Sequence, residues 1–362
     1  MNISVISFTP NGIRLSKRLA EAWENPHKNV DVEKLVLYKK CKAGSGDETG
    51  YPVRSVEQGV EEWTCKQMRE GNALLFIGAC GIAVRAIAPY LTDKLHDGPV
   101  LVMDEKGAYV IPILSGHFGG ANEIAARIAG IMGAIPVITT ATDLNHKFAV
   151  DLFAKKNSLT IANKEGIARV SSKVLSGEEV TVSIESGHLC GDVKPPAGVC
   201  MAPYPPTGPV DILVTAEKKK CDTAILLRPK EYVVGMGCKR GKDAGEIEDL
   251  ILGSLTEACI GMDQLLALAT IDRKKEEPGF LSFSRRHRVP FLTYTAEQLK
   301  GVEGKFQSSA FVLEKMGVDN VCERAAILAC GPAGKIVFGK RARDGMTIAI
   351  AKREWSVTFD GE

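Results

Sequence analysis

The sequence lacks an excess of charge of either sign and any long apolar run, and each absence excludes a class of protein. Its 362 residues include 46 Lys and Arg against 44 Asp and Glu, a formal net charge of +2. A balance this close to neutral gives no sign of a nucleic-acid-binding surface. The longest apolar stretches, Ala73–Cys80 and Ile124–Val137, are too short or too interrupted by charge to cross the ~30 Å hydrocarbon core of a membrane. We therefore expect neither a nucleic-acid partner nor a membrane span.

Cysteine pairs and the common catalytic signatures are also missing. The ten cysteines include no C-x-x-C pair, so neither a structural zinc site nor a disulfide framework is predicted. The amino terminus lacks the basic start and cleavage site of a secretory signal, which favours a cytoplasmic protein. There is no G-x-x-x-x-G-K-[ST], no H-E-x-x-H and no G-x-S-x-G placed as a nucleophile elbow. These absences argue against P-loop ATP hydrolysis, zinc proteolysis and serine-esterase chemistry.

The sequence does have the composition of a folded protein and the alternation of strand-like and helical segments that is typical of the α/β class. Hydrophobic residues make up 45% and charged residues 25% of the chain, whose length suits two or three folding units. Strand-like runs alternate with amphipathic stretches, and the turn-like run Asp104–Gly107 predicts a hairpin. We therefore expect a mixed, mostly parallel sheet covered on both faces. The predicted strands are 3–8, 73–77, 100–103, 110–114 and 137–140, and the predicted helices are 14–24, 81–88 and 121–132.

Two changes of pattern along the chain predict three domains. The run 194–209 is rich in proline, cannot be regular structure and indicates a loop or linker. A strand at 231–237 and a helix at 243–259 then restart the α/β rhythm. We expect an N-terminal α/β domain over residues 1–140, a small α/β middle domain with its linker over 141–230, and a separate α/β C-terminal domain over 231–362.

The most informative segment runs from Leu114 to Glu123 and contains His117. A predicted strand ends there, and a turn with three glycines leads into a predicted helix, so positive φ angles and close approach of a ligand are expected. Free N–H groups at the helix start would attract a carboxylate or an oxyanion, and His117 could exchange a proton near neutral pH. Alternatively, the glycines only shape the turn and His117 caps or packs. The residues proposed from this segment are Ser115, Gly116, His117, Gly119, Gly120 and Asn122.

Two other turns follow predicted strands and are expected to line the same crevice as His117. Ligands in open α/β sheets bind outside the carboxyl ends of strands, which is where both turns are predicted to lie. Arg85 could hold a substrate carboxylate or lie on a solvated helix face, and Asp143 could bind a ligand or start the next helix. The residues proposed from these turns are Gly78, Gly81, Arg85, Thr139, Thr140 and Asp143.

Charged residues between these turns give further candidates. Asp104 and Glu105 in the hairpin could act as general base and acid if one of them were desolvated, or they could be solvated charges. Lys94 lies in a polar connection between Asp93 and Asp97.

In the last domain, the predicted strand runs into Gly235-Met-Gly-Cys-Lys-Arg-Gly241. The third glycine is one position late for a dinucleotide fingerprint, so a turn that holds an anion fits better. The residues proposed from this turn are Gly237, Cys238 and Arg240. A group after the next strand is either a second polar rim or surface charge, and it consists of Thr270, Asp272, Lys274 and Glu277.

Several of these blocks, taken in order, resemble one protein family. They are Phe76–Pro89, Asp93–Asp97, Val102–Gly107, Leu114–Asn122 and Ile138–Asp143, followed by Val234–Gly241, Leu268–Lys274 and Glu323–Ala326. Together they resemble the CbiG family of cobalamin-biosynthesis proteins, the cobalt-precorrin-5A hydrolases, and the last three blocks are also similar to CobE. The resemblance covers the first and last thirds of the chain well and the middle weakly.

The resemblance implies a hydrolase that acts on a carbon–carbon bond in the anaerobic route to vitamin B12. Its substrate would be a cobalt-bound tetrapyrrole with a ring-A δ-lactone; water opens the lactone, acetaldehyde leaves and cobalt-precorrin-5B results. No cofactor and no protein metal ligand are expected, because the macrocycle carries the cobalt. We expect His117 to be the acid/base, Asp104 or Glu105 to be the runner-up base, and the other proposed residues, Lys94 among them, to bind substrate.

A function of a different class fits the same residues. The glycine-rich turns could hold an unstable tetrapyrrole intermediate between enzymes, so that the chain would be a non-catalytic carrier. Release of acetaldehyde above the spontaneous rate would separate the two functions. In both cases the expected partners are the cobalt-precorrin and other enzymes of the pathway, and the sequence leaves a homodimer open.

Overall fold

The computed structural model describes residues 2–23, 34–41, 50–93, 97–117, 119–140, 147–191, 194–217 and 222–360. The chain divides into two compact units, Met1–Lys147 and Phe148–Glu362. The second unit contains two separate sheets, and the predicted boundaries after residues 140 and 230 stay a prediction. Within the described residues, every helix is too short or too polar to cross a membrane.

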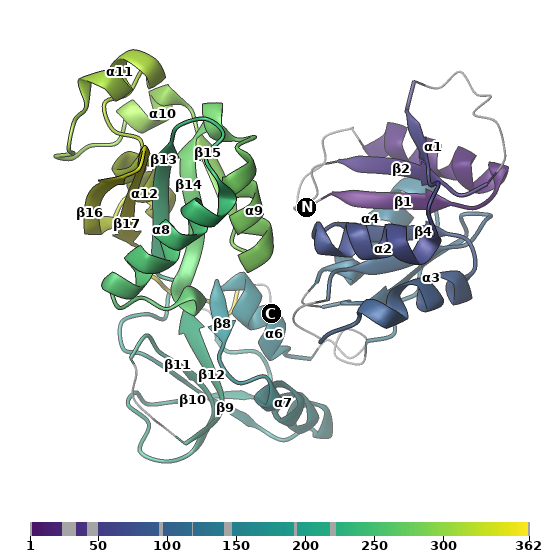
Figure 1. The fold of residues 1–362 in the computed structure, drawn as a ribbon. Coiled ribbons are helices and arrows are strands. Elements are labelled where there is room, and N and C mark those ends of the chain that lie inside the picture. Colours follow the sequence, from purple (N-terminus) through teal and green to yellow (C-terminus); the bar gives the residue numbers. More distant parts are fainter. Residues whose placement is uncertain are drawn as a thin grey trace. The chain divides into compact units, whose positions relative to one another are not determined.

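The first unit is built on one seven-stranded sheet (Figure 1). Its strands are β1 (Ile3–Ser7), β2 (Leu35–Lys39), β3 (Val53–Ser55), β4 (Ala73–Ile77), β5 (Val100–Met103), β6 (Tyr109–Leu114) and β7 (Ile135–Pro136), in the order β3-β2-β1-β4-β5-β6-β7. Strands β1 to β5 are mutually parallel, β6 is antiparallel to β5, and β7 is parallel to β6. The mixed, mostly parallel sheet and the hairpin at Asp104–Gly107 are confirmed.

Helices cover both faces of this sheet. They are α1 (Pro10–Trp23), α2 (Val60–Arg69), α3 (Cys80–Ile87), the 3-10 turn η1 (Ala88–Tyr90) and α4 (Ala121–Met132). In β4, Leu75 belongs to the buried cluster that includes Leu19 of α1 and Ile128 of α4, whereas Phe76 packs edge-on against Trp63 of α2. Alternate residues of one strand therefore enter two cores, which is why this strand reads as a continuous apolar run.

Several parts of the first unit differ from the prediction. The strand expected at 137–140 is wrong: β7 is only Ile135–Pro136, and Thr139 and Thr140 belong to no strand. This position is the sheet edge, where proline is tolerated and pairing stops early. Helix α2 was not predicted because two of its three buried side chains, Thr64 and Gln67, are polar, so its apolar periodicity is weak. Strands β2 and β3 were also missed.

The second unit begins with a five-stranded sheet of order β10-β9-β11-β12-β8. Its elements are α6 (Val150–Lys156), β8 (Leu159–Ile161), α7 (Glu165–Ser176), β9 (Val180–Ile184), β10 (Val199–Ala202), β11 (Val210–Val214) and β12 (Thr223–Pro229). Only β8 is antiparallel to its neighbour. The expectation that 194–209 holds no regular structure is wrong, since β10 lies within it. β10 pairs only with β9, so it is an edge strand, and the prolines flank it without breaking a ladder.

The other sheet of this unit has the order β15-β14-β13-β17-β16. Its elements are β13 (Tyr232–Cys238), α8 (Ala244–Glu257), η2 (Met262–Gln264), β14 (Leu265–Ile271), η3 (Asp272–Lys274), α9 (Pro278–His287), β15 (Phe291–Tyr294), α10 (Ala296–Lys300), α11 (Ala310–Met316), α12 (Cys322–Cys330), β16 (Lys335–Arg343) and β17 (Met346–Lys352). Strands β13, β14 and β15 are parallel, and β17 is antiparallel to β13 and β16.

Gly235 and Gly237 lie inside β13 and not in the turn that follows it. A Cβ atom at Gly235 would overlap the carbonyl oxygen of Cys322 at the start of α12. Gly235 is therefore needed because helix and strand approach closely. The turn itself contains Gly241, whose φ is 72°.

The last residues of the chain tie the two sheets of the second unit together. After β17 the chain returns to the first of these sheets, where Val357 accepts a hydrogen bond from the N–H of Cys190 (2.9 Å). The side chain of Asn157 bonds both the N–H and the carbonyl of Thr358 (2.8 and 3.1 Å). The ring of Phe359 is 2% exposed and stacks on that of Phe153, with 5.0 Å between centroids.

We predict that Phe359→Ala lowers the free energy of unfolding of the full chain by about 3–5 kcal/mol, because a buried aromatic ring is removed from a packed cluster. Urea denaturation followed by circular dichroism measures this change. Phe311→Ala is the matched control, because the Phe311 ring is 66% exposed and its loss should change stability little. Equal midpoints for the two variants would show that the terminal segment does not hold the unit together.

Candidate functional site

The turn that holds His117 wraps around the start of α4. Three N–H groups at that helix start donate to carbonyl oxygens of the turn: Gly120 to His117 (3.0 Å), Ala121 to Ser115 (3.1 Å) and Asn122 to Gly116 (3.0 Å). The His117 side chain is buried. The helix start is thus closed by its own turn.

These bonds correct the prediction of an open oxyanion site at this helix start. The N–H groups of Gly120 and Ala121 already have acceptors, which they would lose on binding an anion. The positive φ expected in the turn is confirmed at Gly120, where it is 84°. A Cβ atom at Gly116 would lie 2.7 Å from Oδ1 of Asn122, and one at Gly119 would overlap Ser115. All three glycines thus serve the tight shape of the turn.

The side chains around this turn form a small polar group. The Ser115 hydroxyl donates to the carbonyl of Asp97 (2.6 Å), and the Asn122 amide donates to the Thr140 hydroxyl (3.2 Å). The structure therefore brings the His117 turn and Thr140 together, as predicted, while Thr139 is exposed nearby. Lys94 and Asp143 lie outside the described residues.

The turn at Gly78–Gly81 and the His117 turn lie at opposite strand ends of the sheet, which are called its two edges below. The expectation that all three turns line one crevice is therefore wrong. In the register, Ile77 at the end of β4 pairs with Met103, whereas Leu114 at the end of β6 pairs with Val100. The cause is the hairpin: β6 runs antiparallel to β4 and β5, so its carboxyl end meets their amino ends. Val100 and Met103 are separated by about 10 Å along the strand.

Asp104 and Glu105 belong to the Gly78 edge as well. The Asp104 carboxylate accepts hydrogen bonds from the N–H groups of Lys106 (2.9 Å) and Tyr109 (2.7 Å), which is a turn-stabilising role. Arg85 is exposed and donates to the Gly81 carbonyl of its own helix (3.2 Å). None of these three side chains shares the sheet edge of His117.

A crevice of about 1230 Å³ opens in the second unit at the carboxyl ends of β13 and β14. Its lining includes seven Lys or Arg residues, Lys239, Arg240, Arg273, Lys274, Lys315, Lys340 and Arg343, against three acidic ones, Glu276, Glu277 and Asp344. This is the edge at which open α/β sheets bind ligands, and the surplus of cations suits a ligand with several carboxylates. Gly237, Cys238 and Arg240, proposed from the sequence, all line this crevice.

A buried ion pair fixes one wall of this basic crevice. Nζ of Lys274 lies 2.8 Å from Oε2 of Glu277, and the two side chains are 7% and 4% exposed. Oε1 of Glu277 accepts the N–H of Gly241 (2.8 Å), so the pair holds the turn that carries Arg240. Burial acts to raise the pKa of Glu277, but the Lys274 ammonium and the N–H groups of Gly241 and Lys242 hold it below the usual value.

Cys238 lines the crevice without the character of a nucleophile. Burial raises the pKa of its thiol to about 11, although Lys274 lies near it. The thiol is therefore protonated at neutral pH, whereas the nucleophilic form of cysteine is the thiolate. Gly237 matters for space, because a Cβ atom there would lie 2.9 Å from the Thr347 hydroxyl oxygen.

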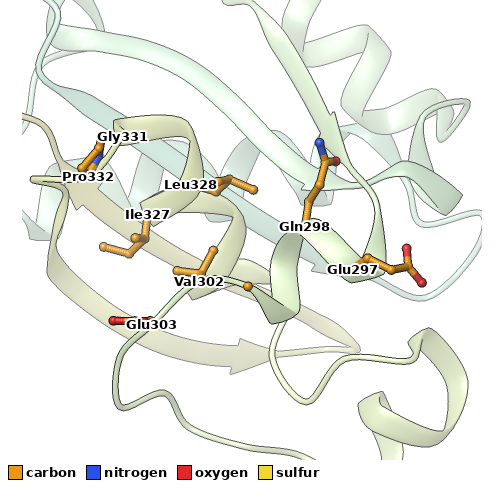
Figure 2. A pocket seen from close by; sticks show the side chains of 9 residues that line it. Glu297, Gln298, Val302, Glu303, Ile327, Leu328, Gly331 and Pro332 are labelled. Atoms are coloured by element: carbon orange, nitrogen blue, oxygen red, sulfur yellow. The ribbon is translucent and has the colours of Figure 1, made fainter.

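A second cavity of about 500 Å³ lies between α10 and α12 (Figure 2). Its charged lining residues are Glu297 and Glu303, and its apolar lining residues include Val302, Ile327 and Leu328. Two carboxylates repel an anionic ligand, so this cavity does not suit the same ligand as the basic crevice. Among the described residues, no group of three or more His, Cys, Asp or Glu side chains is arranged to hold a metal ion.

Comparison with known proteins assigns the family. The pattern described as "Cobalamin synthesis G N-terminal" matches residues 62–143, and "Cobalamin synthesis G C-terminus" matches residues 232–351. The chain is 31% identical to the cobalt-precorrin-5A hydrolase of Priestia megaterium over 96% of this chain and 94% of that protein. The Salmonella typhimurium cobalt-precorrin-5A hydrolase is also 31% identical, over 96% of this chain and 97% of its own. The chain belongs to the CbiG family.

The likeness to CobE is confirmed over a third of this CbiG chain. Protein CobE from a Sinorhizobium species is 28% identical over 120 residues, which is 33% of this chain and 78% of CobE. The C-terminal CbiG pattern includes all the lining residues of the basic crevice, and the N-terminal pattern includes both glycine turns. Neither pattern includes residues 148–230.

Sequence reasoning missed most of the cations of this CbiG crevice. Arg273 lies in η3, Lys315 in α11, and both Lys340 and Arg343 in β16. No motif joins these three elements, so only the fold gathers the four cations. Lys274 and Glu277 were weighed as surface charge and are buried. A Lys and a Glu three residues apart, just after a predicted strand, were the feature of the sequence that could have indicated this ion pair.

For the first site we predict that Gly120→Ala lowers the free energy of unfolding by about 1–2 kcal/mol, because alanine is strained at a φ of 84°. Gly130→Ala in α4 is the matched control: a Cβ atom there has no neighbour within 4 Å, and alanine favours the helix. Thermal unfolding of both variants tests this. Equal destabilisation would contradict a conformational role for Gly120.

For the second site we predict a pH-dependent effect of Glu277→Gln. The pKa of Glu277 is lowered in the folded chain, so its contribution is present above its ordinary value of 4.5 and is lost as the pH falls below it. The variant leaves Lys274 buried without its partner and should be about 3–5 kcal/mol less stable at pH 7. Because glutamine resembles the protonated acid, this difference should shrink in acid. Urea denaturation between pH 3 and 7 measures it, with the exposed Glu276→Gln as control; a difference independent of pH would refute the ion-pair role.

Proposed function

We propose that this chain is a cobalt-precorrin-5A hydrolase of the cobalamin pathway, acting in the cytoplasm on a carbon–carbon bond. The observation that carries the proposal is identity of 31% to two proteins of that name over nearly the whole length of all three chains. A crevice rich in Lys and Arg supports it, since a cobalt-precorrin bears many carboxylates. A homodimer and contacts with other pathway enzymes stay predictions.

The chemistry sets definite demands on the protein. Water adds to the lactone carbonyl, the ring oxygen leaves as an alkoxide and takes a proton, and the lactone becomes a hydroxy acid. That hydroxyl must then lose its proton again, so that its oxygen forms the carbonyl of acetaldehyde as the carbon–carbon bond breaks. The electron pair of the broken bond stays on the macrocycle, which takes up a proton, and acetaldehyde leaves. One group that exchanges protons near neutral pH can serve both steps. The cobalt is proposed to stay in the macrocycle, with no ligand or cofactor from the protein.

His117 is our proposed acid/base. Imidazole is the side chain suited to proton exchange near neutral pH, and His117 lies in a turn bordered by the hydroxyls of Ser115 and Thr140 and the amide of Asn122. Asp104 loses support as the runner-up base, because its carboxylate already accepts the N–H groups of Lys106 and Tyr109 in its own turn. Glu105, in the same hairpin, stays the alternative. Cys238 is not proposed as a nucleophile, because burial raises the pKa of its thiol to about 11.

The basic crevice is our proposed binding site for the tetrapyrrole. Guanidinium and ammonium groups pair with carboxylates, and the Lys274–Glu277 pair keeps the turn of Arg240 in place. Gly237 and Cys238 contribute to its wall by leaving space and a neutral surface. The proposed roles of the His117 turn and of the crevice can be tested independently.

We predict that the purified chain releases acetaldehyde from cobalt-precorrin-5A faster than the spontaneous rate and with saturation. His117→Ala should reduce turnover by about 10²–10⁴-fold, the usual contribution of a positioned proton-transfer group, with little change in tetrapyrrole binding. Asp104→Asn is the matched control and should keep turnover.

Two results would contradict this. Loss of turnover in Asp104→Asn with normal turnover in His117→Ala would move the chemistry to the other sheet edge. Saturable binding without acceleration by the unaltered chain would make it a carrier.

A further inference from the structure

The rim of the basic crevice carries an apolar side chain that the cations do not explain. Phe311 is 66% exposed, the highest exposure among the large hydrophobic side chains of the described residues that are exposed. It lines the crevice together with Val312 and Met316 of the same helix, α11. These three side chains place apolar surface beside the cations inside one crevice, and a ligand that removes this surface from water gains free energy.

Helix α11 is held firmly although none of its side chains is buried. At its start, the N–H of Ser309 donates to the carbonyl of Asp319 (3.0 Å). At its end, Nη1 of Arg273 donates to the carbonyl of Lys315 (2.7 Å), and the N–H of Gly317 closes the last turn on Leu313 (2.9 Å). Hydrogen bonds at both ends of α11 thus hold the helix that places Phe311 at the crevice.

The lining thus has two chemistries, a cationic one and an apolar one. A small inorganic anion or a simple polycarboxylic acid would use only the cations. A ligand that matches both has a broad apolar body with carboxylates around it, which is the form of a carboxylated tetrapyrrole.

We propose that Phe311 is a specificity-determining residue of this crevice, with its ring packed on the face of the bound macrocycle. The inference rests on the proposed function, which places the tetrapyrrole there. Arg240 and its neighbours pair with the carboxylates, and Phe311 selects the apolar ring system that carries them. The ring becomes covered only when ligand is bound.

The test uses the full chain with uroporphyrin, a planar tetrapyrrole with carboxylates around its rim, and measures binding by absorbance titration at several salt concentrations. Phe311→Ala should weaken binding about tenfold and keep the salt dependence of the unaltered chain, because the lost contact is apolar. Phe311→Leu, which retains apolar area, should lose less. Leu313→Ala is the matched control: Leu313 is 50% exposed on the same helix but does not line the crevice, so binding should be unchanged.

A variant of a cation in the basic crevice, Arg240→Gln, separates failure of the Phe311 role from failure of the crevice as the proposed binding site. Arg240→Gln should weaken uroporphyrin binding and make it less salt-dependent. If it does, while Phe311→Ala binds like Leu313→Ala, the crevice is the tetrapyrrole site and the role of Phe311 is refuted. If uroporphyrin binds equally to all variants, the crevice is not the tetrapyrrole site, and the proposed binding site and the role of Phe311 both fail. The hydrolase function is then judged separately, by acetaldehyde release from cobalt-precorrin-5A. If Phe311→Ala leaves binding intact but removes a self-association seen by sedimentation, a second copy of the chain covers the ring and the inference is overturned.

Discussion

The reversal of chain direction between β5 and β6 governs which residues of the first unit can work together. Strands β1 to β5 are parallel, so the turns after β1, β4 and β5 meet at one edge of the sheet. The hairpin sends β6 back, and the turn that follows it closes over the other edge. Asp104 and His117 are only 13 residues apart in number, yet a strand length separates them. Within the first unit, the partners available to His117 are the residues beside it, such as Ser115, Asn122 and Thr140.

The second sheet of the other unit shows the opposite arrangement. Strands β13 and β14 end at the same edge, and β17 begins there because it is antiparallel. Side chains distant in the chain, such as Lys239, Lys274 and Arg343, thereby reach one crevice. The two units illustrate how strand direction, and not the presence of a glycine-rich turn, decides where polar groups collect.

Much of the fold was readable from the sequence because apolar spacing reports local structure well. Strand β4 and helices α3 and α4 lie within a residue or so of their predicted bounds. The site was harder to predict, because the spacing of apolar residues along the chain does not report strand direction or pairing. The three glycine-rich turns look alike in sequence, and nothing in them indicates that the Gly78 turn lies at the opposite edge of the sheet. The net charge of +2 did not predict the basic crevice either, because charges elsewhere in the chain balance its seven cations and three acidic residues. The resemblance to CbiG proteins named the family without assigning these positions.

The two candidate sites also differ in how they could bind an anion. A glycine-rich turn before a helix suggests binding through backbone N–H groups, but at α4 those of Gly120 and Ala121 are bonded within the turn. In the crevice, the N–H of Gly241 is likewise taken, by Glu277. A buried carboxylate there would repel an anionic ligand if Lys274 did not compensate its charge, which gives a reason for a pair whose burial is costly. With these backbone donors occupied, the cationic side chains are the charged groups of the crevice that can pair with a carboxylate, and the neutral ring of Phe311 gives the crevice a contact that charge alone cannot provide.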